Sequence, residues 1–310
     1  MLKYIVKRLL MLIPVLLAVS LITFILGSMS SGDTARTLAE KKHDRPTQAQ
    51  IEEIRVQMGF DRPVLVQYID WFEDVFKKGN LGISYSNDEP VVNEMARYFP
   101  KTLKLALTAL IFLVVIAFTL GILSAVFPES WIDRLSRLYC FCSVSIPEFW
   151  LGLILLYVFG VQYRLVPVLG GNSSGLPIIP ALTISICSGG IYVRLVKTNM
   201  EEVLDKGFIR AARARGVHEY KIVTKHALKN AILPVLNKLG MGFGSLLAGS
   251  AIVESVFSWN GLGKFALESV KLKDYPVVQG YVLFMAVLIV LINLIVDIIC
   301  GIIDPRLKKT

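Results

Sequence analysis

The chain has 310 residues and a formal net charge of +9, and 54% of its residues are hydrophobic while only 18% are charged. This composition excludes an ordinary soluble domain, in which charged residues make up about 25% of the chain. It favours several membrane-spanning helices, because such helices need long runs without charge.

Six apolar runs are each long enough to cross a bilayer. A helix of about 20 apolar residues spans the roughly 30 Å hydrocarbon core. Glu148 interrupts the third run and Lys238 the fifth, and the other four carry no charged residue. In chain order the runs are 9–31, 105–128, 138–163, 165–193, 231–253 and 275–296. We therefore predict an all-α polytopic membrane protein with six transmembrane helices.

The first run predicts an uncleaved membrane helix within residues 1–31. Lys3, Lys7 and Arg8 precede it, as basic residues precede a signal peptide. However, the run is longer than the apolar part of a typical signal peptide, and no Ala-x-Ala cleavage site follows it.

A polar insertion, residues 32–101, follows the first run and reads as a small domain. Its first helix is expected to begin near Thr47 and to stop at Gly59, and a second amphipathic helix is expected over 64–76. Residues 81–85 predict an extended turn or a short strand. A cap packed over the membrane helices is favoured over a ligand site in this domain.

Lysine and arginine collect at both ends of the chain and in the loop between the fourth and fifth runs. The basic residues of that loop are Arg194, Lys197, Lys206, Arg210, Arg213, Arg215, Lys221, Lys225 and Lys229. Positive loops stay in the cytoplasm, and an even number of spans puts both ends on one side. We therefore expect the N-terminus, the loop 194–230 and the tail 306–310 to be cytoplasmic and the insertion to be extracytoplasmic. This distribution explains the basic excess without a nucleic-acid partner.

The cytoplasmic loop contains a candidate docking helix. The segment 208–218 reads Phe-Ile-Arg-Ala-Ala-Arg-Ala-Arg-Gly-Val-His, in which small residues permit close contact with another protein and a glycine can end the helix. The alternative is a basic loop that only contacts lipid headgroups. The candidate docking residues are Phe208, Arg210, Ala211, Ala212, Arg215, Gly216 and Val217.

Polar residues inside the predicted spans are costly and often mark a transport path. Glu148 follows Pro147, which can bend its helix, and an acid there could attract a cationic cargo. A pairing of Glu148 with Lys238, or hydrogen bonds between helices, is the structural alternative. The candidate path residues are Glu148, Asn237, Glu254, Asn293 and Asp297.

The sequence predicts no catalytic, metal or cofactor site of its own. It lacks the Gly-x-x-x-x-Gly-Lys-Ser/Thr phosphate loop, and it has no His-Glu-x-x-His motif. Residues 171–175 match the Gly-x-Ser-x-Gly pattern of serine hydrolases, but two of the three histidines are expected across the membrane. The four cysteines lie in apolar runs and indicate no disulfide framework.

Motifs along nearly the whole chain resemble one family of membrane proteins. They are Gly32-Asp33, Gly59-Phe60-Asp61-Arg62-Pro63, Gly82-Ile83-Ser84, Ser145-Ile146-Pro147, Phe257-Ser258-Trp259, Asp274-Tyr275-Pro276 and Asp304-Pro305-Arg306, together with the segment 208–218. These resemble the permease subunits of dipeptide, oligopeptide and nickel ABC importers. Arg210 replaces the glutamate of the general ABC-importer pattern, and Asn260 also departs from the family.

The resemblance implies a type I ABC importer permease fold, with a core over 102–305 and the segment 208–218 as a coupling helix. It implies a second homologous permease, two ABC ATPase subunits that bind ATP and Mg, and an extracytoplasmic solute-binding protein. It also implies alternating access in a bacterial or archaeal plasma membrane. The cargo is expected to be nickel or another metal chelate, or a short peptide. The alternative is a secondary transporter or channel that works without ATPases.

Overall fold

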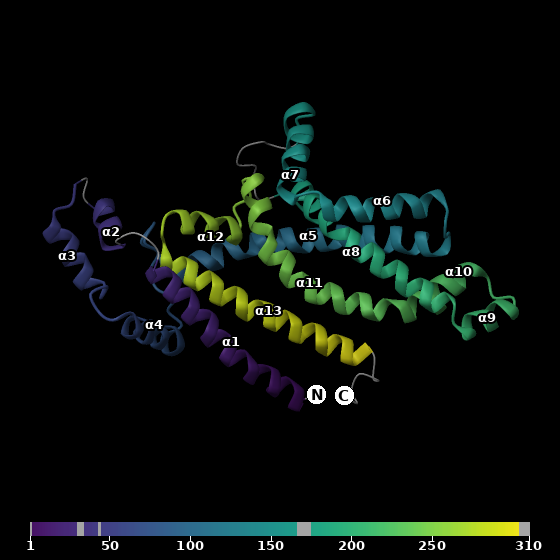
Figure 1. Cartoon of the computed structure of the whole chain (residues 1–310), viewed down its shortest axis with the longest axis horizontal. Coiled ribbons are helices and arrows are strands. Elements are labelled where there is room, and N and C mark those ends of the chain that lie inside the picture. The colour runs from purple at the N-terminus through teal and green to yellow at the C-terminus, as the bar shows by residue number, and fades with distance from the viewer. Residues whose placement is uncertain (1, 30–33, 43–44, 166–174, 304–310) are drawn as a thin grey trace. The chain divides into compact units, whose positions relative to one another are not determined.

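The computed structural model describes residues 2–29, 34–42, 45–165 and 175–303 (Figure 1). Within these ranges the chain is helical, and the only extended pairing is one isolated bridge between Ile83 and Pro90. The chain divides into two compact units. The first comprises 100–264 and 291–310, and the second comprises 2–99 and 265–290.

Among the described residues, five helices are long and apolar enough to cross a membrane, and the number is six if a bent pair of helices counts as one span. The five helices are α1 (Leu2–Met29), α5 (Val91–Val126), α8 (Ile178–Leu204), α11 (Leu228–Val256) and α13 (Tyr275–Ile303). An all-α, polytopic fold is therefore confirmed.

The third predicted span is bent at Pro147, as the sequence allowed, and this bent pair is the sixth candidate span among the described residues. It consists of α6 (Trp131–Ser145), followed by α7 (Glu148–Leu156) with the π-helical segment η1 (Tyr157–Gln162), and the two parts are bent by 103°. Pro147 causes the break, because proline disfavours a helical conformation of the residue before it. Ile146 is accordingly extended, at φ −86° and ψ 122°.

The fourth predicted span was also misplaced along the chain. Helix α8 begins at Ile178 and ends at Leu204, whereas the apolar run covers 165–193. Helix α11 continues a helical stretch that begins at Glu219, twelve residues before the predicted start at 231. Much of the predicted loop 194–230 is therefore helical, because helices extend beyond the apolar core that hydropathy detects.

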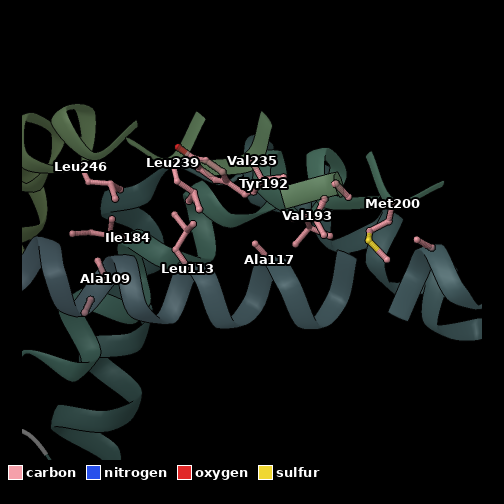
Figure 2. Packing of buried hydrophobic residues seen from close by; sticks show 14 of the residues in the cluster. Ala109, Leu113, Ala117, Ile184, Tyr192, Val193, Met200, Val235, Leu239 and Leu246 are labelled. Carbon is pink, nitrogen blue, oxygen red and sulfur yellow. The ribbon is translucent and has the colours of Figure 1, made fainter. Parts of the chain in front are cut away.

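The core of the first unit lies between α5, α6, α8 and α11. Figure 2 shows the buried residues Leu113 and Ala117 on the side of α5 that faces α8 and α11, where Val193 and Met200 of α8 and Leu239 of α11 are also buried. Small residues bring backbones together, since an added Cβ at Gly121 would overlap Val196 and one at Gly240 would overlap Val296. This close packing makes the four helices a rigid frame for the residues discussed below.

The second unit contains the polar insertion, with helices α2 (Thr34–Lys42), α3 (Gln48–Gln57) and α4 (Val64–Lys78). The expected helix start is confirmed, because the Thr47 and Gln50 side chains form a reciprocal capping box. The helix expected over 64–76 is α4. Helices α2 and α3 share a small apolar cluster that includes Leu38, Ile51 and Ile54.

The turn after α4 is anchored to the beginning of α13 within this unit. The buried carboxylate of Asp274 accepts hydrogen bonds from Ser84 Oγ at 2.6 Å and from the backbone N–H groups of Tyr85 and Ser86 at 3.0 Å. Burial, together with the negative charge of Asp274, raises the pKa of the Tyr85 hydroxyl. The extended turn expected over 81–85 is thus held by the Asp274 carboxylate together with the isolated bridge between Ile83 and Pro90.

Candidate functional site

The segment after α8 folds as two short helices separated by a glycine turn. Helix α9 spans Gly207–Ala214, and α10 (Glu219–Lys221) continues through the π-helical segment η2 (Ile222–Ala227) into α11. Gly216 has a left-handed φ of +75°, and its N–H donates to Arg213 O while Val217 N–H donates to Ala212 O. A Cβ at Gly216 would meet no atom, so the backbone angle, rather than space, requires glycine here.

Helix α9 has one buried face and one exposed face. Ile209 and Ala212 are buried and belong to the same apolar cluster as Ile222 and Ala227 of η2. The prediction that Ala212 contributes to a docking face is therefore not supported: its methyl group fixes α9 to the first unit. The expected docking residues that are exposed are Phe208, Arg210, Ala211, Arg215 and Gly216, while Val217 is half-buried.

An exposed aromatic residue on α10 extends this surface. Tyr220 is 75% exposed and Phe208 is 45% exposed, although both are large and aromatic. The sequence analysis did not single out Tyr220, because one aromatic residue in a charged segment carries no periodic signal. We call the exposed residues Phe208, Arg210, Ala211, Arg215, Gly216 and Tyr220 the coupling surface.

Two arginines stabilise the shape of this segment. Arg213 forms a two-pronged ion pair with Glu219, at 2.6 and 3.1 Å, which joins α9 to α10. The Glu219 carboxylate raises the pKa of the Arg213 guanidinium. Arg210 donates to the carbonyl of Asp205 at 3.0 Å, at the end of α8. The arginine that replaces the expected glutamate therefore caps the preceding helix.

A buried carboxylate connects the α5–α6 turn to the helix that leads into the coupling surface. Asp133 is only 2% exposed and accepts hydrogen bonds from Ser124 Oγ at 2.5 Å, from Lys197 Nζ at 2.5 Å and from Arg137 at 2.9 Å. The turn between α5 and α6 and the C-terminal part of α8 are consequently held together as one body.

Glu254 forms a second buried polar cluster, near the C-terminal end of α11. Its carboxylate accepts from Thr102 Oγ1 at 2.6 Å, from Ser250 Oγ at 3.1 Å and from the Lys264 N–H at 2.8 Å. Thr102 in turn accepts from the Leu262 N–H at 2.7 Å. Glu254 is fully buried and satisfied. These contacts favour a structural role over the expected role in a transport path.

The other expected path residues belong to three different helices, α7, α11 and α13. Glu148 is the half-buried first residue of α7, and within the described residues it forms no ion pair with the exposed Lys238. Asn293 and Asp297 are both half-buried on α13, and the buried Oδ1 of Asn293 has no hydrogen-bond partner among the described residues. Asn237 and Lys238 line a groove described next.

A groove of about 580 Å³ lies between α8 and α11. Its polar lining includes Arg194 and Thr198 of α8 and Asn237 and Lys238 of α11. A second recess of about 630 Å³ lies between α6 and α8 and shares Arg194 and Thr198. Arg194 directly follows the uncharged run 165–193, so the sequence places it in the loop and does not identify it as a residue that lines this groove.

Several sequence-based predictions fall outside the described residues. They are most of the hydrolase-like pattern 171–175 and the motifs Gly32-Asp33 and Asp304-Pro305-Arg306. Among the residues that are described, no group of three or more His, Cys, Asp or Glu side chains could hold a metal ion.

Two family models match the chain. "Binding-protein-dependent transport system inner membrane component" matches residues 117–309, and the N-terminal model of the same transport systems matches residues 1–106.

The chain is similar over almost its whole length to characterised permeases. It is 38% identical over 308 residues to the "Glutathione transport system permease protein GsiC" of Escherichia coli, and the match covers 99% of each chain. The protein of the same name from Shigella dysenteriae is also 38% identical over 308 residues, with the same coverage.

Solved structures with the same fold come from two ABC transporters. A chain of the methionine ABC transporter MetNI, in an inward-facing conformation, has a TM-score of 0.56 and 22% identity, covering 68% of this chain and 96% of that one. A chain of an amino acid ABC transporter has a TM-score of 0.51 and 20% identity, covering 69% of this chain and 94% of that one. Both are ABC transporters, and the similarity establishes the fold.

Proposed function

This chain belongs to the binding-protein-dependent transport system inner membrane components, the permease subunits of ABC importers, and we propose that its cargo is a short peptide. The proposal rests on the 38% identity over 99% of the chain to permeases named for glutathione, which is itself a short peptide. Nickel or another metal chelate, the other cargo that the sequence left open, has no comparable support.

We expect the movement of the ATPase subunits to be transmitted to the permease through the coupling surface. Membership of the family implies ATPase subunits, a paired permease and an external binding protein as partners. We assign the ATPase contact to Phe208, Tyr220 and the arginines around them. Exposed aromatic and arginine side chains are the residue types that contribute most at protein interfaces.

The structure of this segment suits the transmission of movement. Ile209 and Ala212 fix α9 to the packed core, and the Asp133–Lys197 ion pair fixes α8 to the α5–α6 turn. A displacement of the coupling surface is therefore expected to move α6 and α8 together rather than to bend α9 alone. Closure of the ATPases on ATP would then drive the permease between outward-open and inward-open conformations.

The same contacts support the proposed orientation. The Asp133 carboxylate holds the α5–α6 turn to the part of α8 that leads into the coupling surface, so both belong to one side of the membrane. We assign that side, and both chain termini, to the cytoplasm of a bacterial or archaeal cell, and the insertion 32–101 to the outside. Glu148, Asn293 and Asp297 remain candidates for the path, and Glu148 suits the ammonium group of a peptide.

Reconstitution of the whole importer tests the proposal. The chain, its paired permease, the ATPases and the binding protein would be placed in liposomes, with labelled dipeptides, glutathione and a nickel chelate offered separately. We expect ATP-dependent uptake of at least one peptide. Uptake of nickel chelates alone would contradict the peptide assignment, and peptide uptake without the ATPases would favour a secondary transporter.

A further inference from the structure

The exposed face of α11 differs from faces that contact lipid. Its exposed residues recur every three or four positions and include small or polar ones at Ser245, Ala248, Gly249 and Ser255. A Cβ at Gly249 would meet no atom, so no other described part of the chain covers this part of the face. Side chains that face lipid are typically large and apolar. The composition of the face indicates contact with water or with another protein chain.

Helix α6 provides the comparison within the same unit. The exposed residues of α6 include Trp131, Leu138, Phe141 and Val144, each more than half exposed. These are the large apolar side chains that hydrocarbon accommodates. The exposed face of α11 thus combines small and polar residues with Met241 and Ile252, whereas α6 combines larger apolar residues with Arg134 and Arg137.

The groove between α8 and α11 lies along this face of α11, toward the end of α11 that is joined to the coupling segment. Arg194, Asn237 and Lys238 line it, and none of its eight lining residues is acidic. Leu195, Pro234 and Met241 complete an apolar wall. With a volume of about 580 Å³, it lies in the range of small-molecule sites, roughly 300–1,000 Å³.

The cations of this groove differ from Arg137 and Lys197, two cations nearby, in lacking an acidic partner within the described residues. Arg137 and Lys197 both pair with Asp133, and Lys197 also approaches Glu201 at 3.6 Å. Arg194 and Lys238 form no ion pair within the described part of the chain. An unpaired cation in a membrane span costs free energy, and ionisable residues in such spans typically mark the path of a charged cargo.

We infer that the α8–α11 groove binds the carboxylate of a peptide cargo through Arg194, Lys238 and the amide of Asn237. This inference rests on the proposed function, because it assumes a peptide cargo. A free peptide C-terminus is ionised at neutral pH. Arginine binds carboxylates with two parallel hydrogen bonds, and lysine adds a second positive charge. The apolar wall can contact the side chain next to that carboxylate.

Pairs of cargo that differ only at the C-terminus test this inference. The whole importer in liposomes, with wild-type binding protein at saturation, would be offered each transported peptide as the free acid and as the C-terminal amide. The permease variants are Arg194→Gln and Lys238→Gln, with Arg194→Lys as the variant that keeps the charge. Arg134→Gln is the matched control, because Arg134 is exposed on α6 near the Asp133 ion pairs and lies outside both recesses.

The measured quantity is the ratio of acid uptake to amide uptake in each variant, relative to the wild type. We expect this ratio to fall about tenfold in Arg194→Gln and Lys238→Gln, as for the loss of one charged hydrogen bond. It should recover in part in Arg194→Lys and stay unchanged in Arg134→Gln. Because the binding protein is the same throughout, its own preference cancels from the comparison.

Assembly of each variant would be checked by copurification with the ATPases. Arg194 and Lys238 belong to different helices, so failure of one variant to assemble still leaves the other as a test. An unchanged ratio in an assembled variant, with normal peptide uptake by the wild type, would overturn the assignment of the groove and leave the proposed function standing. Absence of wild-type peptide uptake would overturn the proposed function and, with it, this inference.

Anionic lipid headgroups are the competing ligand for these cations. If they bind lipid, the variants should lose acid and amide uptake equally, and the loss should disappear in liposomes of phosphatidylcholine alone. That result would overturn the inference. A loss confined to the acid cargo in both lipid compositions would support it.

Discussion

At the scale of single residues, backbone angle and hydrogen bonding separate the roles of residues that look alike in the sequence. Gly216 has open space around it but a left-handed φ of +75°. Glu148 and Glu254 are both acids in apolar runs, yet only Glu254 is fully buried and saturated by donors. Sequence position alone does not distinguish these environments.

Replacement of Gly216 by valine is expected to uncouple transport from ATP hydrolysis. A β-branched residue at a left-handed φ costs about 1–2 kcal/mol, which the turn between α9 and α10 would relieve by changing shape. Uptake by the reconstituted importer should fall while copurification with the paired permease persists. Gly207→Ala is the control, because Gly207 also has open space but no positive φ. Wild-type uptake by Gly216→Val would contradict this expectation.

Replacement of Glu254 by glutamine is expected to destabilise the protein rather than to change its cargo. A glutamine amide presents two donors where Thr102, Ser250 and the Lys264 N–H already donate, so about 1–3 kcal/mol of stability should be lost. The melting temperature of the purified complex measures this loss. Glu202→Gln is the control, because Glu202 lies at the exposed surface. An unchanged melting temperature with altered peptide preference would instead indicate that Glu254 contributes to the transport path.

At the scale of helices, the Asp133–Lys197 ion pair is the strongest polar link between the α5–α6 turn and α8. Asp133 is 2% exposed, so removal of its partner leaves a charge with little access to water. Breaking a buried ion pair typically costs about 3–5 kcal/mol, whereas removing both charges costs less. Arg137 still contacts Asp133 and would reduce the effect.

A double-mutant cycle measures this link. Lys197→Met is expected to lower the melting temperature of the complex, and the double variant Asp133→Asn with Lys197→Met is expected to recover part of that loss. Lys206→Met should change little, because the Lys206–Glu202 pair is exposed. Strictly additive effects of the two substitutions would show that the ion pair does not join the helices energetically.

The helices that the sequence predicted well are those with continuous patterns. Helix α13 begins at the predicted residue 275, and α4 begins at the predicted residue 64. The misplacement of α8 has a physical cause: the uncharged residues before 178 count as apolar in hydropathy, although glycine and proline disfavour a helix there. The burial of Ala212 and the groove around Arg194 depend on packing between distant segments, which no local pattern encodes.

At the scale of the whole molecule, the distribution of charge is the basis of the proposed orientation in the membrane. The coupling segment carries many lysines and arginines, and positive segments beside membrane spans remain in the cytoplasm. The polar insertion between α1 and α5 has charges of both signs, so its side follows from the number of spans. The bent α6–α7 pair must therefore be counted as one crossing for α8 to enter the coupling segment on the cytoplasmic side.

Labelling of single cysteines tests this orientation. In a variant without native cysteines, Asn87→Cys and His218→Cys would be exposed to a membrane-impermeant maleimide in intact cells. Both positions are exposed, in the insertion and in the coupling segment respectively. Asn87→Cys should react at once, and His218→Cys should react only after the membrane is permeabilised. If the α6–α7 pair re-enters on one side instead of crossing, the count falls to five and Asn87 and His218 label from the same side.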